Sequence, residues 1–362
     1  VPGYPSAGAA QNGSAQTEWG RLRAENGHPE PFGVKWWGVG NETYGSWEIG
    51  NVPAEEYARR FLHFAERMRA ADPSIRLIAV GADPERYPEW NRTVLQIAGE
   101  AMDCLSLHWY GPHTRDDARP EEMYRAIVAA PVDIERRLRL VEETIAQVLG
   151  PESAVTIAFD EWNVWLDASG DTGIEERYEL RDALLAVGVF NLLTRRCRKV
   201  TMANLAQLVN VLPAISTSRT GAWGTPLYHA FRLHAGSTQP VAVACQVEGP
   251  TFEAPALGNL PALASVPYLD ASATAAEDGG TVTLSVVNRH PSEDIAAEVE
   301  LGGREVVAVP VAELNAANTR ARGSEALPDA VSISIVEPQA PTGPLVYTFP
   351  AHSATLLTLR LE

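Results

Sequence analysis

Up to about residue 235 the chain alternates short apolar runs with longer stretches in which apolar residues recur every three or four positions. The short runs are typical of buried strands, and the longer stretches have the period of amphipathic helices. The predicted strands span residues 34–40, 75–81, 102–108, 154–159 and 199–205. The predicted helices span residues 53–71, 88–99, 132–149, 176–197 and 223–233.

Five strand–helix units in a row favour a parallel sheet with right-handed crossovers. An open doubly wound sheet and a (β/α)8 barrel are both built from such units, and the apolar pattern alone does not choose between them. In both folds, functional side chains gather at the carboxyl ends of the strands. The residues at those ends therefore decide the interpretation.

The pattern changes at about residue 236, beyond which helical periodicity almost disappears and turn signals such as Gly279–Gly280 separate strand-like runs. The predicted strands span residues 241–244, 281–287, 297–301, 306–311, 331–335, 345–349 and 353–361. Such a series is typical of an antiparallel β-sandwich. We therefore divide the chain into an α/β domain over residues 1–235 and a sandwich over residues 236–362. Residues 247–266, rich in Pro and Ala, are expected to form a long loop.

Charge and cysteine content narrow the range of functions. The 362 residues carry 29 Lys+Arg against 46 Asp+Glu, a formal net charge of −17. This balance argues against nucleic acid or a membrane as partner, because phosphate contacts need clusters of Lys and Arg. Cys104, Cys197 and Cys245 lie far apart without metal-binding spacing, so neither a disulfide framework nor a metal site is expected. With no long apolar run and no signal segment in this sequence, we expect a cytoplasmic location.

Polar and aromatic residues gather where three predicted strands end. The first strand runs into Asn41–Glu42, the third into His108–Tyr110 and the fourth into Asp160–Trp162. Each cluster alone has an ordinary explanation, since Asn-Glu after a strand is usually a turn or a helix cap and a lone histidine is usually a hydrogen-bonded core residue. Packing alone does not predict three such clusters in order, so together they indicate an active site.

Two carboxylates from separate strand ends suit the hydrolysis of a glycosidic bond. One carboxylic acid protonates the leaving oxygen, and the other carboxylate attacks the sugar carbon; retaining enzymes hold the pair about 5–5.5 Å apart. Glu42 and Glu161 are the candidates. We expect Glu42 to have a raised pKa, so that it keeps its proton, and Glu161 to be ionised. The neighbouring amide, phenol and indole groups suit the hydroxyls and apolar faces of a sugar.

Two segments carry a resemblance to a known family. Gly38–Glu42, preceded by Asn26–Pro31, resembles the acid/base segment of glycoside hydrolase family 51, the α-L-arabinofuranosidases. Phe159–Trp165 resembles the nucleophile segment of that family, and the spacing of 119 residues between the two glutamates is typical of it. Leu205–Leu212 and Val266–Ala273 are further family-like segments. The resemblance extends from about residue 19 to residue 362.

The resemblance implies a retaining α-L-arabinofuranosidase that releases terminal arabinofuranose from arabinoxylan, arabinan or derived oligosaccharides by double displacement. Glu42 would be the general acid/base and Glu161 the nucleophile. The further roles implied are a hydrogen bond to the sugar 2-hydroxyl for Asn41, a place beside the nucleophile for Tyr110, support of the same network for His108, and the pocket mouth for Trp165. The reaction would need no metal and no cofactor. Members of the family often form oligomers, which allows a homo-oligomer here.

The order of the strands departs from the family. The family places its acid/base after barrel strand 4 and its nucleophile after strand 7, whereas Glu42 follows the first predicted strand and Glu161 the fourth. The resemblance therefore implies strands 4 to 8 of a (β/α)8 TIM barrel followed by the β-sandwich, with strands 1 to 3 encoded upstream. Five strands cannot close an eight-stranded barrel. The loop Thr43–Trp47 differs among family members and is expected to affect the preference for the leaving group.

Other functions stay open at this point. A related retaining glycosidase, an endo-glucanase or a β-xylosidase, would use the same pair of carboxylates. A non-catalytic carbohydrate-binding protein would use the sandwich as its binding module, and an inactive fragment would keep the motifs without turnover. Two intact carboxylates argue against the non-catalytic protein.

Overall fold

The computed structural model describes residues 11–166, 174–339 and 343–362. The chain divides into two compact units. The first contains the residues up to His108 together with Arg139–Ala158, and the second contains Trp109–Leu138 together with Phe159–Glu362. Within the described residues, no helix has the length and apolar character that a membrane crossing requires.

Five strands form one sheet in the order β1-β2-β3-β4-β5, so strands that follow one another in the chain are neighbours in the sheet. Their bounds are Trp36–Val39, Arg76–Ala79, Cys104–Pro112, Thr156–Trp165 and Val200–Leu205. β1 pairs with β2, and β2 with β3, in parallel register. The five predicted strands are thus confirmed, and the boundary between the two units passes through β3 and β4.

Two of these strands are longer than the sequence pattern predicts. β3 continues through His108 and Tyr110, and β4 continues through Glu161 to Trp165. The predicted strand ends at His108 and Phe159 are therefore wrong, because polar side chains at the end of a run were taken to end it, and Tyr110 and Glu161 lie within the strands. In both strands buried positions recur beyond the polar residues, at Trp109 and Trp162. The candidate residues thus stand on strands.

Several helices belong to the first unit. They are α2 (Glu18–Glu25), α3 (Ala54–Ala71), α4 (Pro88–Ala98) with the 3-10 turn Gly99–Ala101, and the second half of α5 (Pro120–Leu149). α3 and α4 confirm their predicted amphipathic pattern, and α3 buries Tyr57, Phe61 and Ala65. The pattern did not predict α2, because its eight residues are largely polar and exposed.

Helix α5 begins at Pro120, well before the predicted start at residue 132. Pro131 lies inside it, and a proline is a common signal for the first turn of a helix. In the structure the Pro131 ring lies against α6 (Leu180–Arg196) at Gly188, where an added Cβ would come within 2.8 Å of its Cγ. A glycine on α6 thus makes room for the proline of α5.

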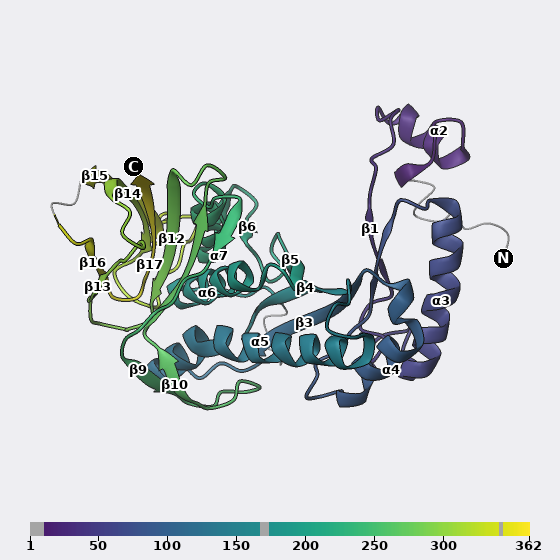
Figure 1. The fold of residues 1–362 in the computed structure, drawn as a ribbon, viewed down its shortest axis with the longest axis horizontal. Helices are drawn as coiled ribbons and strands as arrows, with labels where there is room; N and C mark the ends of the chain where they lie inside the picture. The colour runs from purple at the N-terminus through teal and green to yellow at the C-terminus, as the bar shows by residue number, and fades with distance from the viewer. Residues whose placement is uncertain (1–10, 167–173, 340–342) are drawn as a thin grey trace. The chain divides into compact units, whose positions relative to one another are not determined.

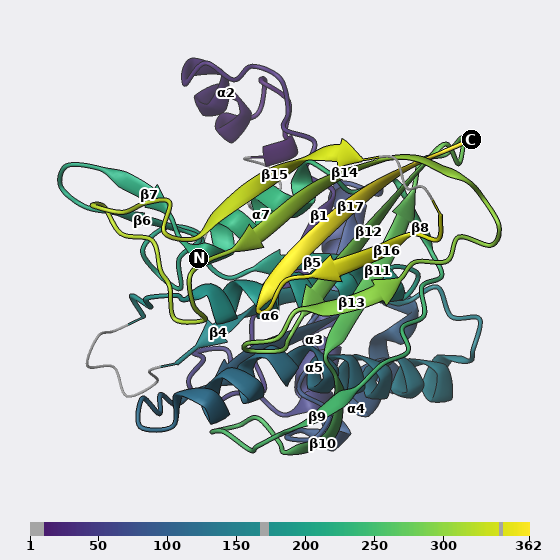
Figure 2. The ribbon, with the colours of Figure 1, turned by 90° about the vertical axis from the view of Figure 1, so that its left-hand side faces the viewer.

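The second unit contains the sandwich (Figures 1 and 2). A six-stranded sheet has the order β15-β14-β17-β12-β11-β8, and β13 pairs with β16. The bounds are β8 Val241–Val243, β11 Leu269–Ala275, β12 Thr281–Asn288, β13 Ile295–Glu298, β14 Val306–Asn315, β15 Ser332–Gln339, β16 Val346–Phe349 and β17 Ser353–Leu361. The apolar core includes Leu269, Val286, Val311, Phe349, Leu357 and Leu359. The expected antiparallel sandwich is confirmed.

The expectation of a long loop over residues 247–266 is wrong. β9 (Thr251–Ala254) pairs antiparallel with β10 (Leu263–Pro267), and Phe252 and Val266 are buried. The high content of Pro and Ala concealed the alternation of a short hairpin. The remaining elements are β6 (Ile215–Thr217), β7 (Ala222–Gly224) and α7 (Pro226–Ala235). The predicted boundary at residues 235/236 stays a prediction, since both sides of it lie in one compact unit.

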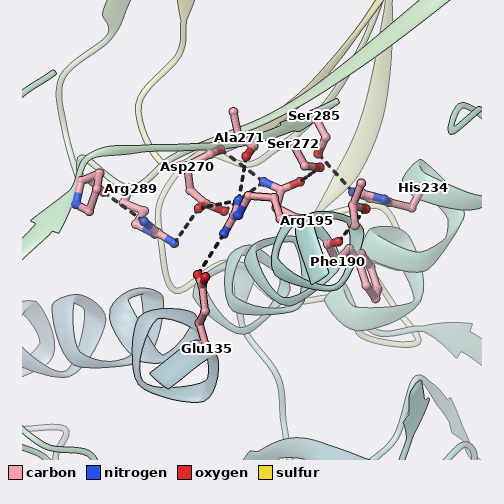
Figure 3. Close-up of polar contacts among 12 residues, drawn as sticks. Glu135, Phe190, Arg195, His234, Asp270, Ala271, Ser272, Ser285 and Arg289 are labelled. Carbon is pink, nitrogen blue, oxygen red and sulfur yellow. Dashed lines mark hydrogen bonds and ion pairs between the residues drawn. The ribbon is translucent and has the colours of Figure 1, made fainter. Parts of the chain in front are cut away.

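Polar side chains join α6 to the sandwich sheet (Figure 3). Asp270 of β11 lies between two arginines, with Oδ1 at 3.2 Å from Nη1 of Arg195 and 3.5 Å from Nη2 of Arg289. Asn191 of α6 donates to Asp270 Oδ2 at 3.0 Å and accepts a hydrogen bond from Ser272. Because β11 alternates, Leu269 and Ala271 point into the apolar core while Asp270 and Ser272 face the helix.

Candidate active site

Glu42 lies in a sharp turn after β1. The backbone of Gly40 has φ +99° and that of Glu42 has φ 40°, both in the left-handed region. A Cβ at Gly40 would meet Tyr57 and Val80 at 3.3 Å, so this position favours glycine for its conformation and for space. The Tyr57 hydroxyl donates to Val39 O and accepts from Val80 N, both at 2.7 Å. This buried tyrosine ties the ends of β1 and β2 together beneath the turn.

Three side chains of the first unit contact the Glu42 carboxylate. His108 Nδ1 lies 2.8 Å from Oε1, and the Tyr44 hydroxyl donates to the same oxygen at 3.1 Å. The indole N–H of Trp47 donates to Oε2 at 2.6 Å. The Glu42 side chain is 17% exposed and that of His108 is 8% exposed. The structure therefore brings Glu42 and His108 together, whereas the support of the Glu161 network that the resemblance implied for His108 stays a prediction.

These contacts set the charge of Glu42. Burial raises its pKa, but the hydrogen bonds from His108 and Trp47, the charge of His108 and the hydrogen bond from Tyr44 together outweigh burial. The net result is a pKa below the ordinary value of 4.5. The expectation of a raised pKa is therefore not met in this conformation, because donors to a carboxylate stabilise its ionised form.

Asn41 points elsewhere. Its Nδ2 donates to Glu48 Oε1 at 3.2 Å, and the residue is exposed. The expected hydrogen bond from Asn41 to a sugar hydroxyl therefore stays a prediction, and in the present conformation it would first have to exchange Glu48 for the sugar.

Glu161 stands in the middle of β4, within the second unit. The Tyr110 hydroxyl, from β3, donates to Glu161 Oε2 at 2.7 Å. The Tyr110 ring meets the edge of Trp165 with centroids 5.7 Å apart and an interplanar angle of 84°. The His113 ring also packs against Trp165, with centroids 5.1 Å apart, and its backbone N–H donates to Trp165 O. The structure thus joins three of the predicted residues, Glu161, Tyr110 and Trp165.

Side-chain hydrogen bonds within the second unit hold the part of β4 that follows Glu161. The buried Asn163 donates to Ala206 O at 2.6 Å and to Leu212 O at 2.9 Å. The Tyr178 hydroxyl donates to Val164 O at 2.7 Å. Two loops that follow in the chain, one before α6 and one after β5, are thereby tied to the strand that bears Glu161, which restricts its movement.

Sequence reasoning missed three residues of these surroundings. Tyr44 and Trp47 follow Glu42 directly, within a loop that was noted only for its difference from the family, and His113 follows β3. The signal available was composition: an indole and a phenol within five residues of a candidate acid. The contacts themselves depend on the left-handed turn at Glu42, which no periodicity indicates.

Comparisons with known proteins agree with the fold and the motifs. A family model described as the alpha-L-arabinofuranosidase 1 domain matches residues 10–125, and one described as the alpha-L-arabinofuranosidase C-terminal domain matches residues 160–353. The chain is 34% identical to alpha-L-arabinofuranosidase C of Emericella nidulans, covering 96% of this chain and 69% of that protein. It is 29% identical to an intracellular exo-alpha-(1->5)-L-arabinofuranosidase of Halalkalibacterium halodurans, covering 78% of this chain and 58% of that protein.

A solved structure gives the same result. The GH51 alpha-L-arabinofuranosidase of Thermotoga petrophila superposes with a TM-score of 0.86 at 35% identity, covering 97% of this chain and 71% of that one. This likeness confirms the expected fold class, a part of a (β/α)8 barrel followed by an antiparallel β-sandwich.

Proposed function

The chain belongs to the α-L-arabinofuranosidases of glycoside hydrolase family 51, and from that premise we propose that Glu42 and Glu161 are its catalytic pair. Glycoside hydrolysis is the activity of this family. The observation that carries the assignment is the hydrogen bond of 2.7 Å from Tyr110 to Glu161, which orients a carboxylate at the centre of β4. Glu42 is supported by its position in a fixed turn among hydrogen-bond donors.

The proposed reaction has two steps. The Glu161 carboxylate attacks the anomeric carbon of an arabinofuranoside while Glu42 gives its proton to the departing oxygen, which leaves a glycosyl ester on Glu161. Glu42 then removes a proton from water, the water oxygen attacks the same carbon, and the ester bond breaks. Two inversions restore the starting configuration. Carboxylates supply both the nucleophile and the proton transfers, so the proposed steps use no metal or cofactor.

The neighbouring residues have supporting roles in this proposal. Tyr110 orients Glu161, and His108 orients Glu42 through Nδ1. Asn41 binds the sugar 2-hydroxyl, a contact that strengthens as positive charge develops on the ring. Trp165, held between Tyr110 and His113, lines the mouth of the pocket.

We further propose a substrate with terminal arabinofuranose, carried by arabinan, arabinoxylan or oligosaccharides derived from them. The name of the Halalkalibacterium relative, an intracellular exo-alpha-(1->5)-L-arabinofuranosidase, supports an exo-acting enzyme and a cytoplasmic location. A membrane or a nucleic acid as partner is disfavoured by the net charge of −17.

Azide rescue tests the two roles separately in the protein as expressed from its gene. Glu161→Ala should abolish hydrolysis of an aryl α-L-arabinofuranoside, and azide should restore turnover as the inverted glycosyl azide. Glu42→Ala should retain the first step with a good leaving group, and azide should give the retained glycosyl azide. Exposed Glu56→Ala is the matched control. Unchanged activity of Glu161→Ala would refute its assignment as nucleophile.

A second assay separates the alternatives. Aryl α-L-arabinofuranoside and aryl β-D-xyloside are compared by kcat/KM at equal enzyme concentration. The proposal expects a clear preference for the arabinofuranoside. Equal turnover of the two substrates would point to a broader retaining glycosidase, and binding of arabino-oligosaccharides without any turnover would point to a carbohydrate-binding protein.

A further inference from the structure

We propose that Trp47 has two positions: its indole caps Glu42 when the aglycone side of the site is empty, and it leaves the carboxylate when a substrate enters. In this view Trp47 is a positioning residue that couples the arrival of the leaving group to the release of the acid. The inference rests on the proposed role of Glu42 as the acid/base.

The geometry around Glu42 distinguishes its two oxygens. Oε1 is shared by His108 and Tyr44, while Oε2 accepts a hydrogen bond from Trp47 at 2.6 Å. His108 and Tyr44 lie in the interior of the unit, whereas Trp47 is 53% exposed. Solvent, and therefore a leaving group, approaches the carboxylate from the side of Trp47 and Oε2.

The capped arrangement opposes acid catalysis. An indole nitrogen is a donor only, so its N–H occupies a lone pair of Oε2 and stabilises the ionised form of Glu42. A protonated Oε2 keeps a further lone pair, so the indole does not forbid protonation, but it lowers the fraction of Glu42 that carries the proton. Withdrawal of Trp47 would therefore favour the protonated acid and open the exposed side of the carboxylate to the leaving oxygen. The lowered pKa of Glu42 in this conformation, where burial is outweighed by its hydrogen bonds, agrees with a carboxylate held ionised.

The loop is built so that Trp47 can leave while Tyr44 stays. The Tyr44 ring packs against Tyr87 at 4.8 Å and Trp90 at 5.7 Å between centroids. Trp47 has only edge contact with Tyr44, at 6.0 Å, and lies 5.6 Å beneath the guanidinium of Arg86. A released indole next to Arg86 would present an apolar face and a charged donor, which suit the ring and hydroxyls of an aglycone sugar.

Gly45 permits the capped position. A Cβ built there would lie 2.3 Å from two carbons of the Trp47 ring, closer than real Cβ contacts occur. Its φ is not in the left-handed region, so alanine fits the backbone and only the indole must shift. Gly45→Ala should therefore expel the indole from Glu42 without removing it from the protein.

Charged and titratable residues of the first unit lie around the hydrogen bond between Trp47 and Glu42. His108 and Tyr44 touch Glu42, Glu48 accepts from Asn41 nearby, and Arg86 lies over Trp47. None of them changes in the variants proposed here except Tyr44 in the control. Shifts in the pH profile can therefore be attributed to the hydrogen bond that each variant removes.

The test compares the pH profiles of kcat/KM and of kcat on their alkaline side, where activity falls as the acid loses its proton. Both profiles are measured with an α-(1→5)-linked arabino-oligosaccharide and the protein as expressed from its gene. The limb of kcat/KM reports the acid in the free enzyme, and the limb of kcat reports it in the complex. Trp47→Phe keeps the ring but removes the donor. We expect its kcat/KM limb to move up by about 1 pH unit, since a charge-assisted hydrogen bond is lost, while its kcat limb stays in place.

Two further variants make the result decisive. Gly45→Ala should reproduce the profile of Trp47→Phe. Tyr44→Phe removes a hydrogen bond that persists in the complex, so it should raise both limbs. If Trp47→Phe moves both limbs, the indole stays on Glu42 in the complex and the proposal is wrong. If it moves neither limb, the hydrogen bond does not control the acid and the proposal is equally wrong.

These outcomes are separable from a failure of the proposed catalytic pair. Should Glu42 not be the acid/base, Glu42→Ala would leave turnover of the oligosaccharide intact, and no Glu42-dependent limb would exist to shift. Should only the two-position inference fail, Glu42→Ala would still be inactive toward the oligosaccharide while the limbs of Trp47→Phe moved together or not at all.

Discussion

The surroundings of Glu42 and of Glu161 differ in how firmly they hold a carboxylate. Glu42 sits in a loop after a strand of four residues, and one of its three hydrogen-bonding partners is a half-exposed tryptophan. Glu161 sits inside a strand of ten residues. Two later residues of the same strand, Asn163 and Val164, are hydrogen-bonded to other parts of the second unit. One carboxylate has a half-exposed partner, and the other stands on a strand that is tied to two loops of its own unit.

This difference matches what the two proposed roles require. A nucleophile must attack along one direction and leave along the same one, so a rigid strand suits it. An acid/base changes protonation twice in each turnover, so its partners have to accommodate two states. Four substitutions test the contrast, in order of decreasing expected effect on free energy.

The largest effect is expected from the charges that hold α6 to the sandwich. Asp270→Ala leaves Arg289, a buried side chain, without its carboxylate, and breaking such a pair from one side costs about 3–5 kcal/mol of the free energy of unfolding. Chemical denaturation measures the loss. Glu55→Ala, which removes an exposed pair with Arg59, should change stability by less than about 0.5 kcal/mol. Similar losses in both variants would mean that the second unit is not braced by buried charge.

A pH dependence of stability should reveal the contact between α7 and the sandwich sheet. Burial of His234 lowers its pKa from 6.5 to about 4, and its Nε2 lies 3.2 Å from Ser285 Oγ. The unfolded chain therefore takes up a proton first as the pH falls, and the contribution of His234 is lost between pH 6.5 and pH 4. The loss amounts to about 3 kcal/mol.

The difference in unfolding free energy between pH 7 and pH 4 should be smaller in His234→Gln by about that amount. An unchanged difference would show that His234 is not buried in its neutral form.

Tyr110→Phe tests the brace on Glu161 itself. Loss of one hydrogen bond to a charged carboxylate costs about 1.5–3 kcal/mol, which corresponds to roughly a 10- to 150-fold fall in kcat. The KM for an aryl arabinofuranoside should change little. Asn259 would still donate to the backbone oxygen of residue 110, so the strand end is kept. A change in KM alone would place Tyr110 in substrate binding instead.

Tyr57→Phe gives the matching test beneath Glu42. It leaves Val39 O and Val80 N without their shared partner, at a cost of about 1–3 kcal/mol in unfolding free energy. Because the turn at Glu42 rests on these strand ends, kcat should fall together with stability. Full activity at the reduced stability would show that the turn is positioned by its own loop.

Much of the fold could be predicted because the apolar periods of α3, α4 and the strands are strong. Helix α5 could not be placed, because Pro131 signals a start and only its fit against Gly188 shows otherwise. The hairpin of β9 and β10 was missed since the many Pro and Ala residues of this segment hide the alternation of its short strands. The strands that bear Tyr110 and Glu161 were ended too early since polar side chains interrupt their apolar runs.

The candidate carboxylates were predictable because position and spacing identify them. The caps on Glu42 were not, since Tyr44 and Trp47 reach it only through a left-handed backbone turn, a property that side-chain periodicity does not encode. The direction of the Glu42 pKa was mistaken for the same reason: sequence suggests burial, and the structure adds the donors.

The alternation along β11 has a consequence for recombination between genes. One face of this strand belongs to the sandwich core, while Asp270 and Ser272 on the other face are matched to Asn191 and Arg195 of α6. A chimaera joined near residue 236 would separate these matched surfaces and set a charged sheet against a foreign helix. A crossover placed before Leu180 would transfer helix and sandwich together, so inherited modules of this enzyme should begin upstream of α6.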